Sequence, residues 1–197
     1  MSLIAPLALL ALTSATHAAF ISGSINFSSG AGGGIIFQDS AGNITTNLAA
    51  AKGIHSWLFT EVEEGSGSFD TVPDGTSVLF SQPWIFNPST SMTPLWTISG
   101  PENFAFNLSS STTIFQNGSF LAIAGTGTFT GTNYDPTPGT WSFTTQGVAA
   151  QGKFSWSTSA LALSPTTRAV PDGGTTVILL GGSLLGLFGL RLKSSGR

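Results

Sequence analysis

The sequence of 197 residues contains no cysteine, one tyrosine and two histidines. Without cysteine the chain can form neither a disulfide nor a thiolate metal site, so its stability must come from packing and backbone hydrogen bonds. Only 8% of the residues are charged, against about 25% in an average soluble protein. Six lysines and arginines give no basic patch of the kind that nucleic-acid binding requires. We therefore expect no nucleic-acid partner.

Large apolar residues alternate with small polar ones over most of the chain, from residue 19 to about residue 162. Alternation at period two is typical of strands with one buried face. Turn-forming segments separate the alternating sets at short intervals. The pattern predicts an all-β ectodomain, residues 19–162, built as a two-sheet β-sandwich or jelly roll, with an open barrel as the alternative. The alternating sets are Ile21/Ile25/Phe27, Trp57/Phe59, Val78/Phe80, Trp84/Phe86, Phe104/Phe106/Leu108, Trp141/Phe143 and Phe154/Trp156.

Turn and glycine signals add detail to this prediction. Asn117-Gly118 between apolar residues predicts a hairpin with a type I′ turn, which needs positive φ at both central residues. Pro73-Asp74-Gly75 predicts a second turn. In Gly125–Thr132 the glycines share one strand face with Phe129, and we expect them to leave room for overlying aromatic rings. Ile44–Ala51 could form one helical turn at most.

The C-terminal region holds a long uncharged apolar run, residues 176–190, followed by basic residues. As a helix it would cover roughly 23 Å, so flanking residues must contribute if it is to span a hydrocarbon core of about 30 Å. Its four glycines disfavour a soluble helix but are common in membrane helices. We predict a transmembrane helix with a cytoplasmic basic stop, and a buried core helix is the alternative. The anchor residues are Val177, Ile178, Leu179, Leu180, Leu184, Leu185, Leu187, Phe188 and Leu190, and the basic stop is Arg191, Lys193 and Arg197.

Residues 1–18 are typical of a secretory signal peptide. An apolar stretch, Leu3–Leu12, precedes Thr16-His17-Ala18, which places small residues before a cut after Ala18. The absence of Lys or Arg after Met1 departs from the usual pattern. Near the other end, residues 163–169 are polar and predict a linker between the β domain and the membrane segment.

The order of motif, apolar run and basic cluster in residues 170–197 resembles the PEP-CTERM group of bacterial C-terminal sorting signals, in the form of its VPDSG-like variants. Asp172 stands where the common form has Glu, and Gly173 where the variant often has Ser. The resemblance implies recognition and cleavage near the motif by an exosortase, a membrane-embedded cysteine transpeptidase. It also implies a Gram-negative host, an inner-membrane-anchored intermediate, and a final place at the cell surface or in the extracellular matrix. The motif residues are Val170, Pro171, Asp172, Gly173 and Gly174.

The motif alone carries little information, because Val-Pro-Asp-Gly also occurs at Val72–Gly75. There it reads as an ordinary turn. The three-part order of the tail, and not the tetrapeptide, is what indicates sorting.

Catalytic signals are weak. After removal of the signal peptide the one remaining histidine is His55, with no nucleophile motif near it. Glu61, Glu63 and Glu64 could belong to a carboxylate pair for glycoside hydrolysis, but a solvated strand end explains them better. Loop Asp and Asn residues offer oxygen ligands suited to calcium without the EF-hand spacing. We expect no enzyme activity, no cofactor and no metal.

Tryptophan suggests an alternative function. Exposed Trp rings stack on sugars in carbohydrate-binding modules, although rings in alternating strands more often pack in a core. The main prediction is a non-enzymatic structural or adhesive protein of the envelope or matrix, and the alternative is an exopolysaccharide-binding module. The sugar-stacking candidates are Trp84, Trp96, Trp141 and Trp156.

Overall fold

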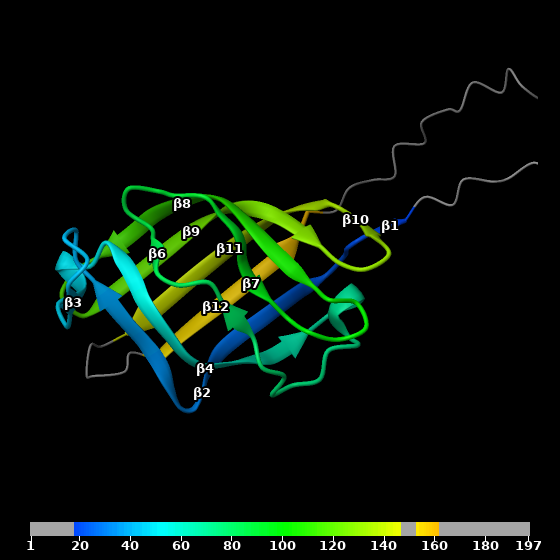
Figure 1. Ribbon diagram of the computed structural model, residues 1–197, viewed down its shortest axis with the longest axis horizontal. Coiled ribbons are helices and arrows are strands. Elements are labelled where there is room, and N and C mark those ends of the chain that lie inside the picture. Colours follow the sequence, from blue (N-terminus) through cyan, green and yellow to red (C-terminus); the bar gives the residue numbers. More distant parts are fainter. Residues whose placement is uncertain (1–17, 147–152, 162–197) are drawn as a thin grey trace, which may run out of the picture. The chain divides into compact units, whose positions relative to one another are not determined.

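The computed structural model describes residues 18–146 and 153–161 (Figure 1). Residues 1–17 of the predicted signal peptide, the linker 163–169 and the whole tail 170–197 lie outside the described residues, and so does the predicted membrane helix 176–190. Within the described ranges, no helix combines the length and apolar character needed to cross a membrane.

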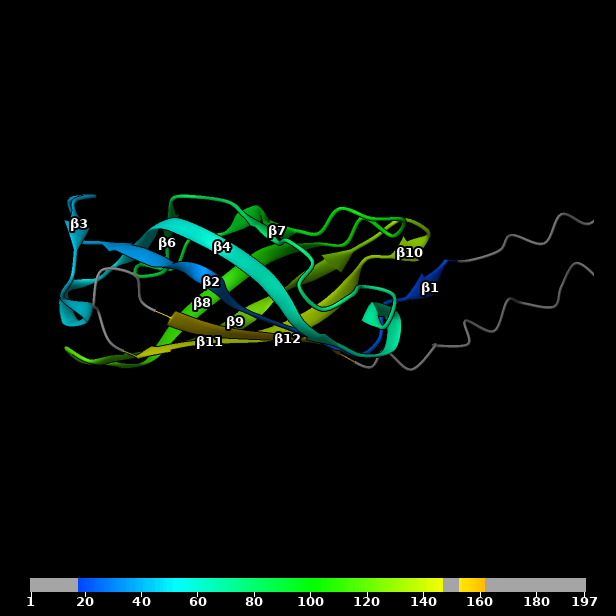
Figure 2. The same cartoon turned by 90° about the horizontal axis from the view of Figure 1, so that it is seen from below.

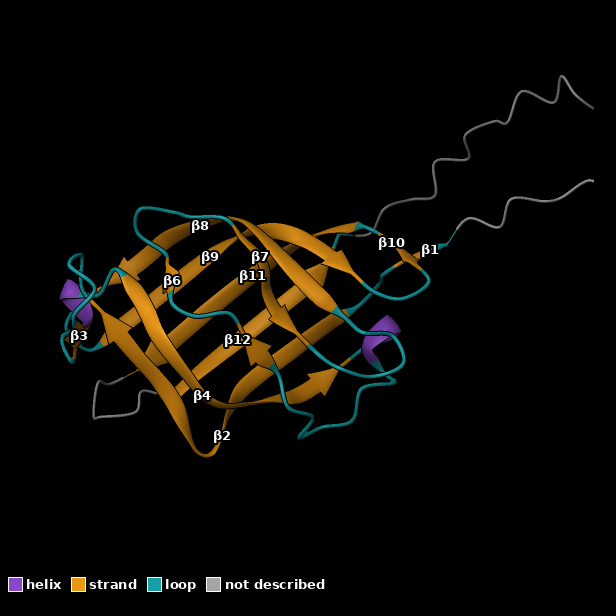
Figure 3. Cartoon of the chain, viewed as in Figure 1, coloured by secondary structure: helices purple, strands orange, loops and turns teal. Residues whose placement is uncertain are grey.

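The described chain is all-β, as predicted, with two short 3₁₀ turns (Figure 3). One sheet runs in the order β5-β7-β8-β9-β11-β12-β2-β4-β6, and β3 pairs with β2 beside this path. A separate parallel pair joins β1 to β10. The elements are β1 Ala19–Phe20, β2 Ser24–Gln38, β3 Ile44–Thr45, η1 Leu48–Ala50, β4 Gly53–Gly65, η2 Gly67–Phe69, β5 Leu79–Phe80, β6 Trp84–Ile85, β7 Met92–Thr97, β8 Ala105–Gln116, β9 Phe120–Thr130, β10 Tyr134–Asp135, β11 Thr137–Gln146 and β12 Lys153–Ala160.

The predicted two-sheet sandwich or jelly roll is corrected by this topology. The large sheet is continuous through its hydrogen bonds and curls into a half-barrel, which is nearer to the open barrel of the alternative prediction (Figure 2). Alternation alone could not decide this, because a sandwich and a curled sheet bury the same face of each strand.

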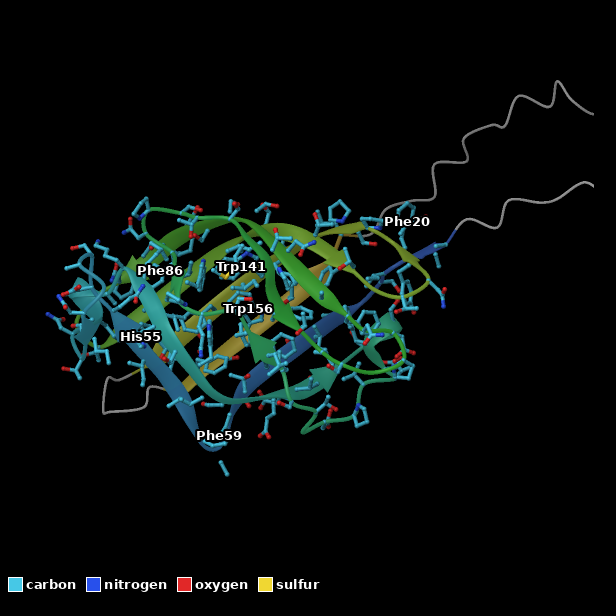
Figure 4. The ribbon with its side chains drawn as sticks, in the orientation of Figure 1. Phe20, His55, Phe59, Phe86, Trp141 and Trp156 are labelled. Atoms are coloured by element: carbon cyan, nitrogen blue, oxygen red, sulfur yellow. The ribbon has the colours of Figure 1, made fainter. Side chains whose placement is uncertain are left out.

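A glycine-rich corner bends β2 and β4. The register between them shifts between Ser29 and Gly34, opposite Leu58–Thr60. At Gly33 the backbone passes so close to the carbonyls of Leu58 and Phe59 that a Cβ would lie 2.6 Å from each oxygen. Phe59, predicted to be buried beside Trp57, instead has φ 46° and is 75% exposed at the tip of this corner (Figure 4). The bend turns its side chain outward, and this breaks the period-two rule locally.

A crossing segment, residues 75–89, joins the two edges of the curled sheet. It contains β5 and β6, the two ends of the strand order, which only residues 81–83 separate. Its backbone bonds to β4 through Val78 N–H to Thr60 O (2.9 Å) and to β7 through Ser81 N–H to Leu95 O (2.7 Å). The segment therefore spans the gap that the curl leaves open.

Aromatic rings fill the concave side of the sheet. Trp141 and Trp156 stack with ring centroids 4.4 Å apart, and Trp84 from the crossing segment meets Trp141 edge-on at 5.5 Å. Phe27 and Trp96 make a second edge contact, at 4.9 Å. These rings belong to one buried core, and burying such rings is the main source of stability in a chain without disulfides.

The predicted role of the glycines is confirmed. A Cβ on Gly127 would lie 2.3 Å from Cζ of Phe106, and one on Gly125 would lie 2.7 Å from Nε1 of Trp141. Gly139, opposite Gly127 on β11, lies under the ring of Phe129 in the same way. The rings, together with the backbone carbonyls of Ser110 and Asn107 on β8, thus occupy the space that side chains would otherwise fill.

The predicted hairpin at Asn117-Gly118 is confirmed, and its turn type was wrong. β8 and β9 flank it, but neither residue has φ in the left-handed region. The Asn117 side-chain oxygen accepts from the N–H groups of Ser119 and Phe120, each at 2.8 Å. This side-chain turn replaces the positive-φ geometry that the sequence pattern predicted.

Gly127→Ala should lower the free energy of unfolding by about 2 kcal/mol, because the buried Phe106 ring cannot yield without disturbing its neighbours. Gly118→Ala is the matched control, since a Cβ there meets nothing within 4 Å, and its effect should stay within about 0.5 kcal/mol. Urea unfolding of the full chain, followed by tryptophan fluorescence, measures both. Equal effects of the two substitutions would contradict the packing of ring on glycine.

Candidate functional site

The chain enters and leaves the β domain at the same end. Next to β1, the Ile21 N–H donates to Thr137 Oγ1 at 2.9 Å. After β12, the Leu161 N–H donates to Pro138 O at 2.9 Å. Both bonds reach the start of β11, so β1 and the end of β12 lie close together, as Figure 1 shows at the right of the molecule. β1 begins at Ala19, the residue that the predicted cleavage would make the N-terminus.

The internal Val-Pro-Asp-Gly copy is a folded turn. Val72 is buried, Gly75 has φ 78°, and its N–H donates to Val62 O at 2.8 Å. The turn forms one wall of a surface cleft of about 150 Å³, whose other wall is the loop Ile98–Phe104. That volume is below the roughly 300–1,000 Å³ of typical small-molecule sites.

The four candidate sugar-stacking tryptophans all belong to the core. Trp84, Trp96 and Trp156 are fully buried and Trp141 is 3% exposed. Figure 4 shows Trp141 and Trp156 together on the concave side of the sheet. Their ring faces are covered by other aromatic rings, so none is available to a sugar.

The residues weighed for catalysis and metal binding do not form one constellation. His55 Nδ1 lies 2.8 Å from its neighbour Ser56 Oγ, and the Glu61 carboxylate packs over Gly30. The backbone N–H of Asn43, together with that of Ala41, holds the pKa of the Asp39 carboxyl below its ordinary value. This carboxylate therefore stabilises the turn Asp39–Asn43 by accepting hydrogen bonds from its backbone. No cluster of three His, Asp or Glu side chains suited to a metal ion occurs in residues 18–146 and 153–161.

The convex side of the sheet carries a surface that the sequence analysis did not single out. Ser and Thr side chains alternate with the buried rings on β11 and β12, and the strand register aligns them with Ala122, Ala124 and Thr126 of β9 into rows. The signal was present in the sequence as the polar half of the alternation. We call this surface the hydroxyl face. Its three rows are Ser110, Thr126, Thr140, Ser159 and Ser24; Thr112, Ala124, Ser142, Ser157, Asn26 and Glu64; and Phe115, Ala122, Thr144, Ser155, Ser28 and Glu61.

Comparison with known proteins identifies the tail. The VPDSG-CTERM motif matches residues 169–194. No curated protein and no solved structure matches the chain. The match covers the predicted motif residues Val170–Gly174 and does not extend into the β domain.

Trp156→Phe should destabilise the domain by about 1 kcal/mol more than Trp96→Phe. Both indoles are fully buried, so the loss of volume is the same. Only Trp156 donates its N–H, to the buried Thr158 Oγ1 at 2.6 Å, whereas the Trp96 N–H has no acceptor among the described residues. Urea unfolding followed by far-UV circular dichroism compares the two variants. Equal losses would show that the indole–hydroxyl bond contributes nothing to stability.

Proposed function

We propose that this chain, which carries a VPDSG-CTERM sorting signal at residues 169–194, is a non-enzymatic structural or adhesive component of the bacterial cell surface or extracellular matrix. The sorting signal is the observation that carries the proposal. It marks an exported protein that is anchored in the membrane and processed towards the surface by an exosortase-type system.

The arrangement of the domain ends supports this reading. The tail follows Leu161, and Leu161 bonds to Pro138 at the end of the sheet where β1 also begins. A leader before Ala19 and an anchor after residue 169 would therefore attach at one end of the β domain. Such a domain can stay folded while its membrane segments are removed one after the other.

The chemistry of the described residues supports a role without catalysis. The interior is filled by aromatic and aliphatic side chains packed against each other. A general acid or base must come within hydrogen-bond reach of the substrate atom that it serves. His55 lies against its neighbour Ser56, the Glu61 carboxylate packs over Gly30, and neither residue lines the cleft beside the Val72–Gly75 turn. Sugar stacking on tryptophan has no support, because all four candidate rings are buried.

The tail double variant Pro171→Ala/Asp172→Ala should block processing in the native host. We expect the chain to accumulate in the membrane fraction with its C-terminus intact at Arg197, whereas the unaltered protein ends near the motif. Mass spectrometry of the C-terminus after fractionation into membrane and medium measures this. An unaltered protein that keeps its whole tail in the membrane fraction would contradict exosortase processing.

The internal copy provides the matched control. Pro73→Ala/Asp74→Ala changes the same residues within Val-Pro-Asp-Gly, in a turn that the fold holds by the Gly75–Val62 hydrogen bond. Processing of this variant should be normal. Loss of processing in both double variants would point to a general defect in export and not to recognition of the tail.

A further inference from the structure

The hydroxyl face is regular and uncharged at its centre. The cross-strand pairs Thr140↔Ser159, Ser142↔Ser157 and Thr144↔Ser155 put hydroxyls side by side on β11 and β12. Strands lie about 4.8 Å apart, so the six-strand row from Thr112 to Glu64 extends over roughly 24 Å. In Figure 2, β9, β11 and β12 lie together along the lower margin of the molecule.

The hydroxyls at the centre of this face are free to bond with something else. Thr140, Ser142, Thr144, Ser155 and Ser159 are exposed, and in the described part of the chain their side chains have no hydrogen-bond partner. Each threonine is β-branched and therefore stiff at χ1, which lowers the entropy lost on binding. A row of ordered donors and acceptors at a fixed spacing is thus available on the surface.

The chemistry of the face excludes several kinds of partner. β9, β11 and β2 contain no charged residue, and β12 contains one, Lys153 at its first position, so the face carries no basic patch for a nucleic acid, an anionic lipid or an acidic polymer. None of the large exposed apolar side chains of the described chain belongs to β9, β11 or β12. Ile114 and Phe115 on β8 are exposed at the border of the face, and these two side chains leave its centre without an apolar patch for docking of a protein or an acyl chain. A partner must bind through many neutral hydrogen bonds.

Planar acceptors border the face on one side. Asn26 on β2 pairs with Glu64 on β4, and Ser28 pairs with Glu61. A carboxylate accepts two hydrogen bonds in one plane, which suits a pair of neighbouring hydroxyl groups. Their negative charge also disfavours anionic polymers.

We infer that the hydroxyl face binds a neutral polysaccharide chain. The chain lies across the strands, exchanges hydrogen bonds with the hydroxyl rows, and presents its vicinal diols to Glu61, Asn26 and Glu64. Each bond is weak, and affinity comes from many bonds made together. The inference rests on the proposed function, because it requires the domain to be exported to a place where such chains occur.

The test uses the full chain in a detergent without a sugar headgroup. Beads of cellulose, agarose and cross-linked dextran are the neutral probes, and alginate beads are the acidic comparison. We expect at least one neutral probe, and not alginate, to retain the protein. Thr140→Val/Thr144→Val keeps the β-branched shape and removes two hydroxyls, so retention should weaken by roughly tenfold while the melting temperature is unchanged.

Thr46→Val/Thr71→Val is the matched control, because both residues are exposed and lie away from the hydroxyl face. Its retention should equal that of the unaltered chain. Failure of all three neutral probes to retain the unaltered chain would overturn the inference, as would unchanged binding by Thr140→Val/Thr144→Val. A dimer that the same double variant abolishes would also overturn it, by assigning the face to a second copy. The C-terminal mass of the same protein from its host reports processing separately, so a chain that is processed but not retained contradicts this inference alone.

Discussion

Aromatic rings seated on backbone glycines are the interaction on which the rest of this structure depends. The chain has no cysteine and few charges, so neither disulfides nor ion pairs can compensate for a poorly packed interior. The Phe106 and Phe129 rings occupy the space above Gly127 and Gly139, and the Trp141 indole lies over Gly125. A glycine in a strand costs backbone entropy. Here the missing side chains leave room for aromatic rings, which would not fit over a strand that carried a side chain at every position. The central strands can therefore curl around a core in which aromatic rings pack among aliphatic side chains.

A curled sheet that fails to close leaves two open edges. The crossing segment pairs with both, because β5 pairs with β7 and β6 pairs with β4. Its strands β5 and β6 form the two ends of the sheet. Trp84 from the same segment is fully buried against Trp141 and Trp156 of the central strands, and the buried Phe86 packs against Trp84. The segment thus covers the core and pairs the edges at once, which removes unpaired backbone that could otherwise join another chain. Because its anchors are aromatic, the closure depends on the same packing as the sheet itself.

The sequence allowed the strand class, the core residues and the glycine contacts to be predicted, because each depends on local alternation. It did not allow the choice between a sandwich and a half-barrel, which depends on pairings between distant segments such as residues 76–78 with β4. Phe59 was misplaced because the corner at Ser29–Gly34 adds residues to one strand only, and no pattern within β4 reveals a change in its partner. The hydroxyl face could not be predicted for a similar reason. Alternation marks each Ser and Thr as exposed, but only the pairing of distant strands aligns them into rows.

The two Val-Pro-Asp-Gly copies show that a short motif acquires meaning from its physical setting. At Val72–Gly75 the backbone is committed to a turn, the valine is buried, and the glycine N–H is bonded to Val62. A processing enzyme must bind an extended chain, and extending this turn would break the bonds that attach the crossing segment to β4. The copy within residues 169–194 follows the last strand and precedes an apolar run, so reading it requires no unfolding of the β domain. Sorting can therefore act on one copy and spare the other without any difference between the tetrapeptides, because the fold protects the internal one.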